Sequence, residues 1–186
     1  MIAIIDYGVG NLFSLRSSLT HLGLEAVVTA DAQTIRKADR LILPGVGAFG
    51  DAMDKLSATG LVPVIREQAA QKPLLGICLG MQLLFEKSYE YGEHGGLGFV
   101  KGEVCPLEPD LKDKTLKVPQ IGWNALHIVR DDPLFRYIRE GEYVYYVHSY
   151  YGKNCTESTL AVSDYSIPVT GVVLSLIHIS EPTRPY

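Results

Sequence analysis

The sequence has few cysteines, no long apolar run and no excess of basic charge, and each shortage excludes a class of protein. Its three cysteines, in 186 residues, include no C-x-x-C pair. This pattern fits neither a disulfide framework nor a zinc site, so we expect a reducing, cytoplasmic environment. No apolar stretch approaches the roughly 20 residues of a membrane span, and the start of the chain resembles a strand rather than a leader. We therefore expect no membrane partner.

Basic charge is also scarce. Lysine and arginine together number 17 against 21 acidic residues, which gives a net charge of −4. Proteins that bind nucleic acids usually carry clustered basic residues, so nucleic acid is not an expected partner. The remaining composition, 47% apolar and 20% charged, is that of an ordinary globular protein. A chain of this length can bury a sizeable core unaided, so we expect no metal and no cofactor.

Apolar runs alternate with helical periodicity through the first half of the chain. Residues 2–5 read as a strand buried on both faces, and leucines at helical spacing follow between Asn11, a candidate N-cap, and Gly23, a candidate stop. The same alternation predicts strands over 26–28, 40–43 and 74–78, and helices over 34–38, 48–59, 61–71 and 79–86. This order predicts an α/β fold whose mostly parallel sheet carries helices on both faces.

The pattern changes after residue 88. Antiparallel strands are expected over 99–107, 115–129, 142–148, 160–162 and 168–173, with a short helix opening at Asp132 and Pro133. With no repeat or low-complexity linker present, we predict one domain over residues 1–173, in which an antiparallel extension completes the sheet.

The segment from Leu74 to Phe85 carries the strongest chemical signal. It places Cys78 at a strand-to-helix junction between Gly76 and Gly80. This arrangement is typical of a nucleophile elbow, in which a tight turn exposes the side chain and the next backbone N–H faces a developing oxyanion. The positive end of a helix there favours a thiolate. The plainer alternative is a buried cysteine packed beside two glycines.

Three further segments carry weaker signals. Residues 44–50 contain three glycines after a strand, which suits either a ligand-binding loop or simply a tight turn. Residues 6–11 begin like a dinucleotide fingerprint, but Phe13 stands where its third glycine belongs, so we predict no nucleotide site. His148 ends an apolar strand and is the histidine best placed to line a pocket, although aromatic residues in such strands usually belong to the core.

Taken together, these motifs make the chain resemble the class I, triad-type glutamine amidotransferases, and within them the glutaminase subunits of imidazole glycerol phosphate synthases. The resemblance extends from residue 1 to about residue 173. It rests on residues 6–8, 10–12, 43–49, 76–82, 96–98, 117–119, 122–124 and 146–150. One small departure is Gln120, where many relatives carry histidine.

The resemblance implies a role for each matching residue. Cys78 would attack the carboxamide carbon of glutamine to give a glutamyl thioester and ammonia. The N–H of Leu79 and an N–H of the Val46 and Gly47 loop would hold the oxyanion, the loop after rearranging. The residues expected to bind glutamine itself are Gln82 and, through their backbones, Ser149 and Tyr150.

The resemblance also implies a partner, a barrel-type cyclase subunit that receives the ammonia to form imidazole glycerol phosphate in histidine biosynthesis. Two alternatives remain open. The chain could be a catalytically inactive assembly or regulatory subunit, or it could serve another amidotransferase branch, which Gly122-Trp123-Asn124 disfavours.

The end of the chain departs from the family. A Gln-Phe-His-Pro-Glu type motif, which supplies the general base and its orienting glutamate, is expected there and is missing. Residues 174–186 instead resemble the translation of a sequencing adapter, so we expect a truncated domain followed by a foreign tail. His178 and Glu181 have the wrong spacing and are not assigned to the triad.

Overall fold

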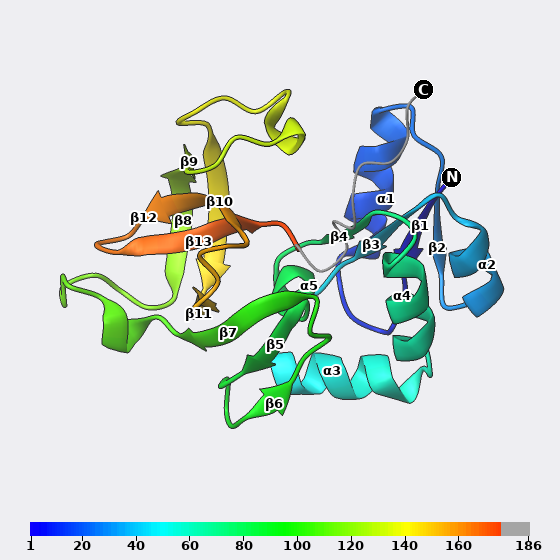
Figure 1. Cartoon of the computed structure of the whole chain (residues 1–186), viewed down its shortest axis with the longest axis horizontal. Coiled ribbons are helices and arrows are strands. Elements are labelled where there is room, and N and C mark those ends of the chain that lie inside the picture. Colours follow the sequence, from blue (N-terminus) through cyan, green and yellow to red (C-terminus); the bar gives the residue numbers. More distant parts are fainter. Residues whose placement is uncertain (176–186) are drawn as a thin grey trace. The chain divides into compact units, whose positions relative to one another are not determined.

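The apolar runs of the first half assemble into a four-stranded parallel sheet (Figure 1). The computed structural model describes residues 1–175. The strand order is β2-β1-β3-β4, with β1 over Ile2–Ile5, β2 over Ala26–Thr29, β3 over Arg40–Leu43 and β4 over Leu74–Gly76. β4 lies at the edge of this sheet. The sheet predicted from the order of elements is confirmed, and its β4 strand is shorter than expected.

Helices cover both faces of this sheet. They are α1 over Leu12–His21, α2 over Ala32–Lys37, α3 over Phe49–Ala58, α4 over Val62–Ala69 and α5 over Leu79–Gln82. Leu19 of α1 packs with Ile2, Ile4 and Ile42 on one face. The intervening strand residues point to the other face and are also buried, as alternation requires. In the described part of the chain, no helix has the length and apolarity needed to cross a membrane.

The predicted start and end of α1 are confirmed. The Asn11 side chain accepts a hydrogen bond from the N–H of Ser14 at 3.2 Å, which satisfies one of the free donors of the first turn. Gly23 follows the C-cap with φ +71°, a left-handed conformation that favours glycine. Local sequence therefore sets both boundaries of this helix.

One predicted helix is wrong in its second half. The helix expected over 79–86 ends at Gln82, and residues Phe85–Ser88 form strand β5, parallel to β7, Val100–Pro106. Phe85, Lys87 and Ser88 pair with Val100, Glu103 and Val104 of β7, so pairing with a distant strand determines the structure of this segment. A short apolar run does not distinguish helix from strand by periodicity.

Two compact units make up the chain, and β5 begins the second. The first unit comprises residues 1–84 with 93–97, and the second comprises residues 85–92 with those from 98 onward. The first contains the parallel sheet and the short strand β6, His94–Gly95. The single domain over 1–173 stays a prediction, and residues 176–186 of the predicted foreign tail lie outside the described residues.

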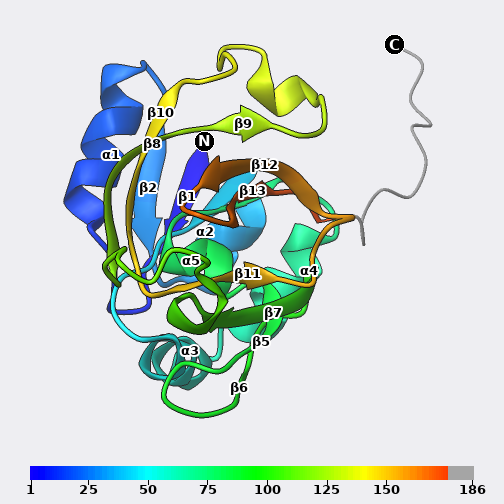
Figure 2. The ribbon, with the colours of Figure 1, turned by 90° about the vertical axis from the view of Figure 1, so that its left-hand side faces the viewer.

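The second unit contains antiparallel strands where they were predicted, except that the strand expected over 115–129 begins only at Gln120 and is divided into β8 and β9. β11 pairs antiparallel with β7, β8 pairs with β10, and β12 pairs with both β9 and β13. Figure 2 shows β8 and β10 side by side as a two-stranded ribbon. The bounds of the strands not yet given are Gln120–Ala125 for β8, His127–Ile128 for β9, Tyr143–His148 for β10, Tyr150–Lys153 for β11, Thr159–Asp164 for β12 and Pro168–Val173 for β13. Two 3-10 turns, Glu108–Asp110 and Pro133–Phe135, complete this unit.

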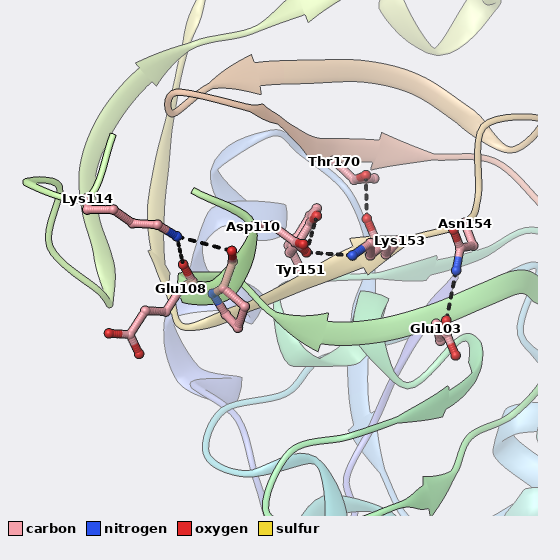
Figure 3. Close-up of polar contacts among 10 residues, drawn as sticks. Glu103, Glu108, Asp110, Lys114, Tyr151, Lys153, Asn154 and Thr170 are labelled. Carbon is pink, nitrogen blue, oxygen red and sulfur yellow. Dashed lines mark hydrogen bonds and ion pairs between the residues drawn. The ribbon is translucent and has the colours of Figure 1, made fainter. Parts of the chain in front are cut away.

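Asp110 ties the first of these turns to β11 (Figure 3). Its carboxylate accepts hydrogen bonds from the Nζ of Lys153 at 2.7 Å and from the hydroxyl of Tyr151 at 2.9 Å. The bond from Lys153, assisted by that from Tyr151, holds the pKa of the Asp110 carboxyl below its usual value. Burial and the adjacent carboxylate raise the pKa of Tyr151, which stays a neutral donor.

Replacing Asp110 with asparagine is expected to destabilise the protein by about 1 kcal/mol at neutral pH, because a charged acceptor of two hydrogen bonds is lost. A carboxyl whose pKa is lowered by folding stabilises the protein above its unfolded pKa of about 3.9, and this contribution disappears as the pH falls through the folded pKa. Urea unfolding from pH 8 to pH 3 measures the free energy of unfolding of both proteins. The difference between the unsubstituted protein and Asp110→Asn should stay constant down to about pH 5 and shrink below about pH 4. Asp131→Asn, the same change at an exposed position of the same unit, is the control.

Candidate active site

Cys78 lies on a strained turn between β4 and α5. Its backbone has φ 56° and ψ −119°, a conformation that side-chain-bearing residues rarely adopt, and its side chain is exposed. Strain of this kind costs about 1–3 kcal/mol and persists only where the surroundings enforce it. The nucleophile elbow predicted from the glycine spacing is therefore present, and the alternative of a buried core cysteine is wrong.

The glycines on either side of Cys78 are required by close backbone approach. A Cβ on Gly80 would lie 1.9 Å from the carbonyl oxygen of Leu43, and one on Gly76 would lie 2.6 Å from the carbonyl oxygen of Gly80. The N–H of Ile77 donates to the same Leu43 carbonyl at 3.0 Å. The end of β3 thus supports the elbow through contacts that no side chain could fit between.

The loop after β3 packs against the start of α5. A Cβ on Gly45 would lie 2.6 Å from the amide nitrogen of Gly80, so this loop is held close to the residue after Leu79. The next residues, Val46 and Gly47, are exposed, and Gly47 has φ +93°. Among the described residues, the backbone N–H groups of Leu79 and Gly47 have no acceptor. A free N–H directly after an exposed thiol, as at Leu79, is what an oxyanion hole requires.

Tyr7 fixes the base of this loop. Its side chain is buried, and its hydroxyl donates to the carbonyl of Pro44 at 2.6 Å. Burial raises the pKa of the phenol, so it remains a neutral donor. Residues 6–8 were predicted only as a family motif, although a tyrosine two residues after a fully buried strand was a usable signal for this contact.

Gln82 completes the part of the site that belongs to the first unit. Its backbone N–H donates to the carbonyl of Cys78 at 3.2 Å, so the two residues are one helical turn apart. Residues four apart lie on one face of a helix. The structure therefore brings together five predicted site residues in this unit, namely Val46, Gly47, Cys78, Leu79 and Gln82.

Ser149 and Tyr150 belong to the second unit, where Ser149 joins β10 to β11 and Tyr150 is the first residue of β11. The Ser149 carbonyl accepts from the N–H of Leu107 at 2.9 Å, and the Tyr150 carbonyl lies 2.6 Å from Nδ1 of His148. Burial lowers the pKa of His148, and the Tyr150 carbonyl opposes that shift. The glutamine-binding roles of Ser149 and Tyr150, and the pocket role of His148, stay predictions.

The other two cysteines lie in different surroundings. Cys155 is buried, with Sγ 3.5 Å from the hydroxyl oxygen of Thr159. Cys105 is partly buried in β7, where burial, followed by the charge of Glu103, raises the pKa of its thiol and disfavours the thiolate. Only Cys78 combines an exposed thiol with an elbow. Among the described residues, no group of three or more histidine, cysteine or acidic side chains could hold a metal ion.

Comparison of the sequence with known protein families identifies the family of this chain. Residues 3–182 match the family of class I glutamine amidotransferases. The chain belongs to the class I glutamine amidotransferases. The role of Cys78 as the nucleophile, which the motif predicted, stays a prediction. Solved structures agree at the level of the fold: a glutamine amidotransferase matches with TM-score 0.68 and 17% identity over 91% of this chain and 83% of its own.

Curated relatives within this amidotransferase family are considerably closer in sequence. The imidazole glycerol phosphate synthase subunit HisH of Sulfurimonas denitrificans is 50% identical over 152 residues, 81% of this chain and 73% of its own length. That of Wolinella succinogenes is 45% identical over 93% of this chain and 85% of its own length, and that of Bacillus cereus is 48% identical over 93% and 81%.

The close approach of Gly80 and Leu43 gives a direct test of the elbow. Gly80→Ala is expected to destabilise the protein by about 2 kcal/mol or more, because the new methyl group would displace a backbone carbonyl. Gly95→Ala is the matched control, since a Cβ there meets nothing within 4 Å. Denaturant unfolding of both variants measures the difference. Equal stabilities would contradict the packing described for the elbow.

Proposed function

We propose that the chain is a glutaminase subunit that hydrolyses glutamine to glutamate and ammonia. The ammonia passes to a barrel-type cyclase partner, which uses it to form imidazole glycerol phosphate in histidine biosynthesis. The observation that carries this proposal is the exposed thiol of Cys78 on a strained elbow, directly followed by the free backbone N–H of Leu79. The names of the HisH relatives support the choice of substrate and partner.

The proposed reaction proceeds in two steps. The Sγ of Cys78 attacks the carboxamide carbon, the C–N bond breaks, and the departing nitrogen takes a proton to leave as ammonia. Water then hydrolyses the thioester to glutamate and regenerates the thiol. The N–H groups of Leu79 and of the Val46 and Gly47 loop would stabilise the oxyanion in both steps.

Both steps also need a general base. His178 and Glu181 lie outside the described residues, and their spacing differs from the family motif. We propose that they do not replace it, so that the chain as written is a poor glutaminase. Positioned general acid–base catalysis contributes about 10²–10⁴-fold in rate.

Glutamate release with the cyclase partner present tests these assignments. A version ending in the family-type His-Pro-Glu sequence is expected to hydrolyse glutamine at least about 100-fold faster than the chain as written. In that version, Cys78→Ser should abolish turnover, whereas the control Cys105→Ser should preserve it.

Two results would change the interpretation. Equal rates with and without the family-type ending would make His178 a candidate base. Inactivity of both versions would favour an assembly or regulatory subunit.

An exposed apolar face supports the proposed partner. Trp123 pairs across β8 and β10 with Tyr145, their rings 5.4 Å apart, and Ile121 pairs with Val147. All four side chains are more than half exposed, Trp123 to 66%. Contiguous exposed apolar patches of this kind usually mark interaction surfaces, and tryptophan and tyrosine often dominate their binding energy. We propose that this face, defined by these four residues, binds the cyclase subunit.

Trp123→Ala is expected to weaken association with the cyclase subunit by about 30-fold, the effect of losing a binding hot spot of roughly 2 kcal/mol. Tyr137→Ala is the control, because Tyr137 is 84% exposed but lies outside β8 and β10. Calorimetric titration of the cyclase subunit measures both. Equal affinities in the two variants would place the interface elsewhere.

A further inference from the structure

A chain of polar contacts runs through the second unit from β12 to the joint between β10 and β11. The side-chain amide of Asn124 donates to the carbonyl of Asp164 at 3.3 Å, and that of Gln120 donates to the Asn124 side-chain oxygen at 3.0 Å. The Gln120 side-chain oxygen lies 3.1 Å from Nε2 of His148, whose Nδ1 lies 2.6 Å from the carbonyl of Tyr150. Gln120 is fully buried, so each of its contacts replaces water.

Both ends of this chain are backbone carbonyls, which only accept hydrogen bonds. Donation toward Asp164 requires the amides of Asn124 and Gln120 to point the same way, which leaves the oxygen of Gln120 facing His148. Nε2 of His148 must then carry a proton. Nδ1 must carry one as well, because it faces the carbonyl of Tyr150. All four contacts are hydrogen bonds only when His148 is doubly protonated.

A neutral His148 can keep its contact with Tyr150 only if the amides reverse. Nδ1 then retains the single proton, and Nε2 becomes an acceptor that needs the NH₂ group of Gln120. Asn124 must turn in response, and the mismatch moves to its contact with Asp164. That contact is the longest of the four and is solvent-exposed, so water can satisfy it.

We propose that Gln120 is a positioning residue of the glutamine site, because its amide reverses with the protonation of His148 and keeps the Nδ1 proton of that ring on the Tyr150 carbonyl in both states. The inference rests on the proposed function, in which the backbone of Ser149 and Tyr150 binds glutamine. An amide suits this role because it can either donate or accept, whereas a carboxylate only accepts and a methionine does neither.

The groups around His148 leave the Gln120 side chain as the side-chain hydrogen-bond partner of its ring. From its own strand, the ring of Tyr146 lies 5.2 Å away, and the Tyr146 hydroxyl donates to the hydroxyl oxygen of Ser163 on β12. β8 contributes the Gln120 side chain and β11 the Tyr150 carbonyl. Burial is the main influence on the ring and lowers its pKa, and the hydrogen bond to the Tyr150 carbonyl opposes that shift.

Histidine NMR of the full chain tests the coupling without any assay of activity. In the unsubstituted protein, His148 should titrate below its usual value of about 6.5 with Nδ1 protonated in the neutral form. Gln120→Glu should raise the midpoint by about one unit or more and move the neutral ring's proton to Nε2. Gln71→Glu, the same change at an exposed position, should leave both unchanged. An equal response in the two variants would overturn the proposal.

A second variant guards against failure of Gln120→Glu to fold. Asn124→Asp lies nearer the exposed end of the chain and places an acceptor opposite the NH₂ group of Gln120. This change holds the Gln120 oxygen toward His148. The midpoint of the His148 titration should therefore rise, by less than in Gln120→Glu. A midpoint that stays constant or falls in this variant would contradict the amide reversal.

Glutamine binding, measured in a Cys78→Ser background with the cyclase partner, tests the consequence for the site. With Gln120 in place, the affinity for glutamine should not change across the pH range in which His148 titrates. With Gln120→Glu, the affinity should fall about tenfold as His148 becomes neutral. Gln120→Met should weaken binding at every pH, which a pH-dependent structural effect would not do. A constant affinity in Gln120→Glu would overturn the positioning role. Absence of binding by the unsubstituted sequence, with the NMR shifts intact, would instead contradict the proposed function and the positioning role with it.

Discussion

The candidate site depends on one steric constraint, the approach of the Gly80 backbone to the carbonyl of Leu43. No Cβ fits between them, and the gap is closed further by the hydrogen bond from Ile77 to the same carbonyl. These contacts hold the elbow against the end of β3, which in turn keeps Cys78 in its strained conformation. Strain at a nucleophile needs such support, since an unsupported turn would relax. The parallel pairing of β3 with β4 brings the two segments together.

The second unit contains chains of polar contacts that join its strands and turns. Asp110 joins two donors on β11, and His148 joins a side chain of β8 to the carbonyl of Tyr150. Chains of this type are sensitive to protonation because each member must donate and accept in a fixed order. Among the described residues, no buried side-chain polar atom lacks a hydrogen-bond partner.

The sequence predicted the parallel sheet and the elbow because both depend on local features. The run at residues 2–5 is buried on both faces as expected, and the glycines around Cys78 have the steric role that their spacing indicated. Two features were not predicted from the sequence, because they depend on residues far away in the chain. Residues 85–88 form a strand by pairing with β7, and Gln120 gains its role from His148, 28 positions away. Neither relationship leaves a periodic signal in the sequence.

The anchoring of Pro44 by Tyr7 determines which part of the loop after β3, residues 44–47, can turn. Pro44 is held by the phenol, and Gly45 is wedged against the first turn of α5, so neither can swing. The peptide plane between Val46 and Gly47 is the next unit of backbone, and Gly47 tolerates either sign of φ. A half-turn of this single plane would exchange its carbonyl for its N–H without displacing its neighbours. Rotation in the loop after β3 is therefore confined to one peptide plane, whose two orientations point either a carbonyl or an N–H in a given direction.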